Sequence, residues 1–350
     1  MKYRFTACAV MLVACATANA DLRPDTHAPI TIMGDHIHKQ GELMLSYRYM
    51  HMSMKDNRDS TSRISPEEIV TTVPNRFANP PMMPPTLRVV PTKMTMDMHM
   101  LGVMYAPTDR LTLMGMANYQ TKDMTHITFA GPMGTERLGK FKTSTEGFGD
   151  TSVSAMYGLS PAGAGHQWHA TFGVSLPTGS QDEDGRVLTP KNTQPKIRLP
   201  YPMQLGSGTY DLITGLTYAS TAAAWGWGSQ LGAVTRLGDN DEGYTLGNEY
   251  HLKSWLSYLV SNSTSISGRI GMYDRGNIDG IDSRIMAPVQ TADPSLQGGQ
   301  RIDLGLGMNM LLPAKGHRLA LEASVPVYQN LNGPQLEVDW TLTIGWQYSP

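Results

Sequence analysis

Hydrophobic and polar residues alternate with a period of two over residues 336–348. One face carries the apolar set Leu336, Val338, Trp340, Leu342, Ile344, Trp346 and Tyr348, and the other face carries polar or small residues such as Glu337, Asp339 and Gln347. A tilted strand of about 9–11 residues with lipid on one side and water on the other shows this pattern. The segment therefore predicts a membrane-spanning β-strand.

The same alternation recurs along the chain. Twelve segments show it, near residues 41–54, 92–106, 109–122, 149–159, 166–176, 208–220, 223–236, 244–259, 264–273, 300–312, 317–329 and 336–348. Single-chain barrels of the bacterial outer membrane have an even number of antiparallel strands. The pattern predicts an all-β fold, a transmembrane antiparallel β-barrel of about 12 strands.

The joints between these segments alternate in length. Short joints such as 107–108 and 221–222 alternate with longer ones such as 55–91, 123–148, 177–207 and 274–299, which are rich in Pro, Asp, Asn and Gly. Outer-membrane barrels have short periplasmic turns and long outer loops. Both chain ends are therefore expected on the periplasmic side. A secreted sandwich of many short strands is the alternative.

The N-terminus indicates export. Lys2 and Arg4 precede a small, apolar run, and Ala18-Asn19-Ala20 has the small-x-small form of a cleavage site. We expect a signal peptide over 1–20, a periplasmic N-terminal segment over 21–40 and the barrel over 41–350. A lipoprotein box ending at Cys15 is the alternative processing signal. The His-rich stretch 27–38 is interpreted as an exposed lead in preference to a short plug.

Composition excludes several functional classes. Charged residues make up 17% of the chain and the formal net charge is −2, so a basic nucleic-acid-binding surface is not expected. No phosphate-binding Gly-rich loop, zinc His-Glu motif or nucleophile elbow occurs, and no enzyme activity is expected. An outer-membrane phospholipase would need a Ser and a His on its outer wall, but nothing distinguishes His99 or Ser154 for that role.

Methionine is the unusual component, with 24 residues against 6 Phe. Thioethers are soft ligands for Cu(I) or Ag(I), and Met-x-Met on a strand spaces sulfurs about 6.8 Å apart on one face. The candidate metal-contacting residues are Met50, Met52, Met54, Met94, Met96, Met98, His99, Met114 and Met116. Two alternatives remain open: lipid-facing filler, if a bulge near residue 99 reverses the faces, or a flexible apolar lining that adapts to varied solutes.

Charged residues also occur on the faces predicted to be interior. They are Arg48, Glu249, His251, Arg269, Asp303, Glu322 and Glu337. A packed network of ion pairs or a wet wall is favoured over a selectivity filter.

Three motifs carry a family resemblance. Gly147-Phe148-Gly149-Asp150, Ser175-Leu176-Pro177-Thr178-Gly179-Ser180 and Gln204-Leu205-Gly206-Ser207-Gly208-Thr209-Tyr210-Asp211 occur in order before, at the end of and at the start of predicted strands. In these motifs the chain resembles the meta-pathway phenol-degradation transporter-like outer-membrane family over roughly 40–348, in a Met-rich branch. The resemblance implies an outer-membrane barrel with a transport role.

Together these observations predict a passive, narrow transport route of the outer membrane for small hydrophobic or aromatic compounds. The alternative function is Met/His-rich binding or export of soft metal ions. No cofactor is expected apart from Cu(I) or Ag(I) in that alternative. The expected partners are outer-membrane lipid, a small hydrophobic solute or soft metal ion, and the barrel assembly machinery, with no nucleic acid.

Overall fold

The computed structural model describes residues 23–161 and 166–350. The expected signal peptide and the alternative lipid site at Cys15 lie outside these residues. No helix in the described part of the chain is long and apolar enough to cross a membrane.

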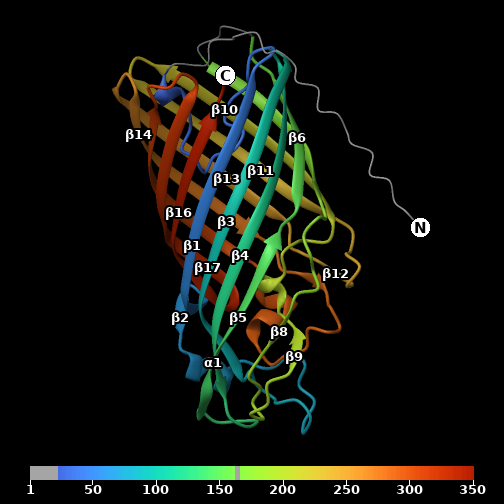
Figure 1. Cartoon of the computed structure of the whole chain (residues 1–350). Coiled ribbons are helices and arrows are strands. Elements are labelled where there is room, and N and C mark those ends of the chain that lie inside the picture. The colour runs from blue at the N-terminus through green and yellow to red at the C-terminus, as the bar shows by residue number, and fades with distance from the viewer. Residues whose placement is uncertain (1–22, 162–165) are drawn as a thin grey trace, which may run out of the picture.

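A closed antiparallel β-barrel dominates the structure (Figure 1). Each strand pairs with its neighbours in the barrel, and β1 pairs with β17 to close it. The barrel strands are β1 (Leu43–Ser60), β3 (Val89–Thr108), β4 (Leu111–Phe129), β6 (Thr151–Gly158), β7 (His166–Leu176), β10 (Tyr210–Ala222), β11 (Trp225–Leu237), β13 (Glu249–Ser261), β14 (Thr264–Arg275), β16 (Gly299–Leu311) and β17 (His317–Tyr348).

Strand β17 supplies two segments of the barrel. Its first half pairs with β16 and its second half pairs with β1. The chain reverses near Gly333, whose φ of 85° favours glycine, and the stacked rings of His317 and Tyr348 bring the ends of β17 together. The eleven labelled strands thus provide about the twelve segments that the alternation predicted, and the all-β barrel is confirmed.

The outer face of the barrel is apolar, as the lipid-facing side of such a strand requires. Leu101, Phe172 and Leu306 are among its most exposed side chains. Aromatic pairs lie near the short turns: Trp168 with Tyr218, Trp225 with Tyr258, and Trp346 with Tyr348. Such rings are typical of the boundary between membrane and water. This end of the barrel, which carries the short turns and the C-terminus, is called the terminal end below.

At the opposite, loop end, several strands continue past their neighbours. β1, β3 and β4 have 18, 20 and 19 residues, whereas β10 and β11 have 13 each. β5 (Arg137–Phe148) pairs with the far part of β4, although the sequence predicted a loop over 123–148. These extensions carry polar residues on both faces, so they show no alternation of the membrane type.

Short elements close the loop end. They are β2 (Ser62–Ile64), α1 (Pro66–Thr72), β8 (Asp184–Arg186), β9 (Lys196–Arg198), η2 (Tyr201–Met203), β12 (Tyr244–Thr245), β15 (Asp279–Gly280), η3 (Gln290–Ala292) and η4 (Pro294–Leu296). Their apolar side chains form small cores, one of which joins Tyr201, Tyr244, Ile285 and Val289. The loops are therefore packed structures with buried side chains of their own.

Candidate functional site

The N-terminal residues 23–42 lie inside the terminal end of the barrel; this segment, which includes η1 (Pro24–Thr26), is called the plug below. The Ser265 hydroxyl donates to the carbonyl of Pro24, Gln230 Nε2 donates to Met33, and His169 Nε2 donates to Gly34. These three barrel residues belong to three different strands. The exposed lead favoured from the sequence is therefore wrong for these residues, which fill the barrel as a short plug.

One charged group of the barrel holds the middle of the plug. The carboxylate of Glu322 accepts a hydrogen bond of 2.5 Å from the Thr31 hydroxyl and one of 2.6 Å from Arg269 Nε. The side chains of Arg269 and Glu322 are almost fully buried. A buried carboxylate that satisfies a cation and the plug together is a strong local anchor.

Inward-facing glycines make room for the plug. A Cβ built on Gly226 would lie 2.1 Å from the carbonyl oxygen of Asp25, and one built on Gly345 would lie 2.6 Å from the side chain of Ile30. The plug could thus have been sought in the sequence through glycines on predicted inner faces. Sequence reasoning did not use this signal.

The methionine ladder faces the interior of the barrel. Pairing between β1 and β3 runs without a register shift from Leu43 to Lys55, so no bulge reverses the faces near residue 99. On β4, the same inward parity includes Gln120 and Lys122, which donate to the carbonyls of Leu205 and Gln204 in the infolded loop. The lipid-facing alternative for these methionines is therefore wrong.

The ladder consists of methionines that stand opposite one another on neighbouring strands. The paired residues are Met44 with Met104, Met50 with Met98, Met52 with Met96, and Met54 with Met94 on β1 and β3, followed by Met94 with Met124 and Met104 with Met114 on β3 and β4. Met116 lies opposite Gly102. Toward the loop end, Met94 and Met124 pack against Leu199 and Met203 of the infolded loop. An apolar thioether wall thus lines one side of the interior.

His99 does not lie with these methionines. Its ring is exposed on the outer face, where Nδ1 lies 2.7 Å from the hydroxyl of Tyr47. Its neighbours there are Asp97 and His51, which contact each other at 2.8 Å. The structure therefore separates His99 from the methionine set with which the sequence grouped it.

The charged candidates do face the interior. Arg48, Asp303 and Glu337 are buried together with Arg269 and Glu322, whereas Glu249 and His251 are partly exposed at the inner surface. Ion pairs join Glu337 to Arg58 and Arg63, Asp303 to Arg301, and Glu249 to Arg236. In the described part of the chain these charges are mostly paired, the arrangement expected of an internal network.

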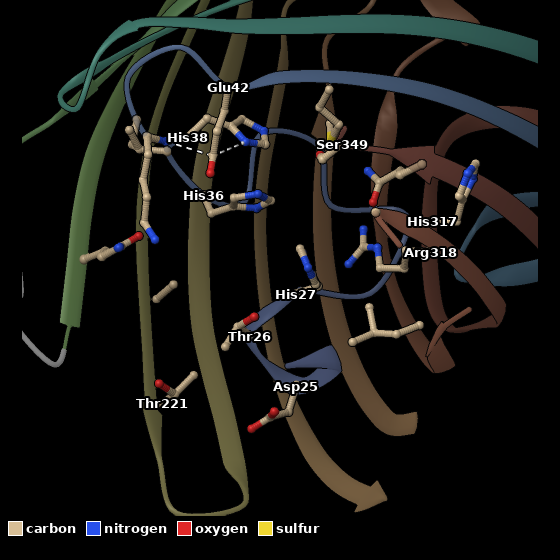
Figure 2. Close-up of a pocket in the computed structure, with 18 of the residues that line it drawn as sticks. Asp25, Thr26, His27, His36, His38, Glu42, Thr221, His317, Arg318 and Ser349 are labelled. Carbon is tan, nitrogen blue, oxygen red and sulfur yellow. Dashed lines mark hydrogen bonds and ion pairs between the residues drawn. The ribbon is translucent and has the colours of Figure 1, made fainter. Parts of the chain in front are cut away.

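A cavity of about 710 Å³ opens between the plug and the barrel wall at the terminal end (Figure 2). Five of the chain's ten histidines line it: His27, His36, His38, His166 and His317. Burial lowers the pKa of His27 and of His38 below the ordinary value of 6.5. Imidazoles in this state are neutral near pH 7 and offer a nitrogen lone pair.

Comparisons with known proteins agree with this architecture. An outer membrane channel from Pseudomonas putida F1 is similar at 17% identity and a TM-score of 0.58, with 91% of this chain and 99% of that chain covered. The β domain of the Bordetella autotransporter BrkA matches with 11% identity, a TM-score of 0.47 and coverage of 88% and 100%. The TodX monoaromatic hydrocarbon channel matches with 9% identity, a TM-score of 0.43 and coverage of 95% and 94%. No curated protein matches the sequence.

A family model covers more than half of the chain. The model described as putative MetA-pathway of phenol degradation matches residues 109–297, from the start of β4 to the end of the infolded loop before β16. The three motifs that carried the resemblance lie within this range. With its closed barrel, infolded loops and this match, the chain belongs to the family of putative MetA-pathway of phenol degradation proteins.

Proposed function

We propose that the protein is a passive outer-membrane channel with a narrow route for small hydrophobic or aromatic compounds. The observation that carries this proposal is the interior thioether wall on β1, β3 and β4, which meets the apolar side chains of the infolded loop. Flexible thioethers adapt to apolar molecules of varied shape. The family's association with phenol degradation and the monoaromatic hydrocarbon named for TodX suggest aromatic compounds as cargo.

In this proposal the terminal end faces the periplasm and the loop end faces outward. Short turns and both chain ends are found on the periplasmic side of outer-membrane barrels, and long loops are found outside. A solute would enter among the infolded loops, contact the methionines and leave past the plug. Because the plug fills part of the lumen, conduction is narrow.

Uptake of a labelled alkylbenzene by outer-membrane vesicles tests the proposal. Vesicles that contain the protein should equilibrate faster than vesicles without it, and replacing Met52 and Met96 with Ser should slow the exchange because polar groups replace an apolar wall. The matched control replaces Met272 and Met308, which are exposed on the outer face, with Leu. Equal exchange with and without the protein would refute a hydrophobic route.

A second candidate function is supported by the geometry of the ladder. Directly opposite residues on antiparallel strands have Cβ atoms about 4.5–5.5 Å apart, so the pairs Met50–Met98, Met52–Met96 and Met54–Met94 form three successive rungs of thioethers. Such rungs suit Cu(I) or Ag(I). Titration of the protein with Ag(I) tests this function, with Met94, Met96 and Met98 replaced by Leu in the variant. Micromolar binding lost in the variant would favour the metal route, and no binding in either protein would leave the hydrophobic route.

A further inference from the structure

The plug brings two histidines and a carboxylate together although they are eight or nine residues apart. One ligand atom from each of His27, Asp35 and His36 lies within 4.8 Å of the other two. The rings of His27 and His36 have centroids 5.0 Å apart and meet edge to face. The plug turns back on itself between these residues because Asp35 accepts a hydrogen bond of 2.8 Å from the backbone N–H of Ala28.

The chemistry of these groups is that of a transition-metal site. Asp35 Oδ1 lies 2.9 Å from Nδ1 of His36, and a carboxylate that orients an imidazole in this way is usual around metal-bound histidines. Nδ1 of His27 is buried and has no hydrogen-bond partner among the described residues. Two imidazoles and one carboxylate suit Zn²⁺ or Cu²⁺, whereas the methionine ladder would suit Cu(I).

The positions need only a small adjustment to bind an ion. Zinc lies about 2.0–2.2 Å from nitrogen and oxygen ligands, so tetrahedral ligand atoms are roughly 3.3 Å apart. Rotation of the two imidazole rings about their side-chain bonds supplies a contraction of that size. The cavity beside the plug gives the ion access and leaves room for a water molecule as fourth ligand (Figure 2).

We propose that His27, Asp35 and His36 form a binding site for a divalent transition-metal ion, Zn²⁺ or Cu²⁺, within the plug. The ion joins the two arms of the plug and fixes its fold inside the barrel. This site is independent of the hydrophobic route and of the methionine ladder, because it uses none of their residues.

Calorimetric titration with Zn²⁺ tests the site in the full mature protein, purified without a polyhistidine tag. The wild-type protein should bind one ion, and His27→Gln or His36→Gln should weaken binding by at least about 100-fold, since loss of even an outer partner weakens metal binding about 10- to 100-fold. The matched controls are His166→Gln and His317→Gln, which change histidines of the same cavity outside the triad. These controls should retain the wild-type affinity.

A second readout identifies the ligands directly. The electron paramagnetic resonance spectrum of the Cu²⁺ form should show coupling to two imidazole nitrogens, and to one in either triad variant. Unchanged Zn²⁺ affinity in both triad variants, or an equal loss in the two controls, would overturn the proposal. Replacing Met94, Met96 and Met98 with Leu should leave Zn²⁺ binding unchanged, so failure of the channel proposal and failure of this site are distinguishable.

Discussion

Replacing Thr31 with Val should loosen the plug without disturbing the barrel. Valine has nearly the same shape as threonine but lacks the hydroxyl that donates to Glu322 at 2.5 Å. Glu322 keeps its ion pair with Arg269, so no buried charge is left without a partner. The substitution therefore removes one contact between plug and barrel.

The expected magnitude follows from the kind of bond that is lost. Hydrogen bonds to charged groups contribute about 1.5–3 kcal/mol. Thr31 is only partly buried, so water can replace part of the interaction and the lower value of about 1.5 kcal/mol applies. Because 1.4 kcal/mol corresponds to a factor of ten, the undocked population of the plug should rise roughly tenfold.

Single-channel recording in planar bilayers measures this population as the fraction of time spent at the higher conductance. The matched control is Thr26→Val, which removes a plug hydroxyl that donates to Arg23 within the plug itself. The control should leave the open fraction near the wild-type value. An unchanged open fraction in Thr31→Val, or an equal rise in both variants, would refute the assignment of Thr31 and Glu322 as an anchor.

Two further predictions concern the plug and the loops. Gly226→Ala should displace the plug entrance and raise conductance, because its Cβ would lie 2.1 Å from the carbonyl of Asp25, whereas Gly268→Ala, which meets nothing within 4 Å, should not; bilayer recording of both variants checks this. Burial raises the pKa of Tyr201 above its ordinary value of 10.0, so the folded loop core retains the proton after the unfolded segment has lost it. Stability of this core should therefore be complete below pH 10 and fall as the pH rises above 10. Tyrosinate absorbance during alkaline titration, compared with Tyr201→Phe, measures the shift, and ionisation of all tyrosines near pH 10 would contradict it.

The barrel was predictable because its strands lie between lipid and an interior, which imposes a period of two on each strand. The segment over 336–348 shows this most clearly, and its partners in the structure are the strands on either side of the predicted closure. The extension of β4 and the whole of β5 were missed for the same reason. Those residues lie beyond the apolar belt, where both faces are polar and no alternation is required.

The position of the plug was not predictable by this method. Its anchors are far away in the sequence: Thr31 contacts Glu322 across 291 residues, and Asn309 donates to the carbonyl of His27 across 282. Short segments with Pro and Gly have no periodicity, so local pattern cannot distinguish an exposed lead from a plug. The methionine faces were easier, since strict parity on β1 and β3 fixed them once a bulge was absent.

The interior is divided by chemistry, and this division bears on how the barrel can conduct. The charged anchor of the plug lies on β14 and β17, whereas the thioether wall lies on β1, β3 and β4. Breaking hydrogen bonds at a hydrated, charged anchor costs little, because water replaces them. Separating the packed apolar wall from the infolded loop exposes hydrophobic surface, unless an apolar solute takes the place of the loop. The plug therefore suits an element that opens by exchange with water, and the methionine wall suits a surface that opens by exchange with a hydrophobic solute. A barrel with both elements in series favours small apolar molecules over ions at the loop end and limits the flow of either at the terminal end.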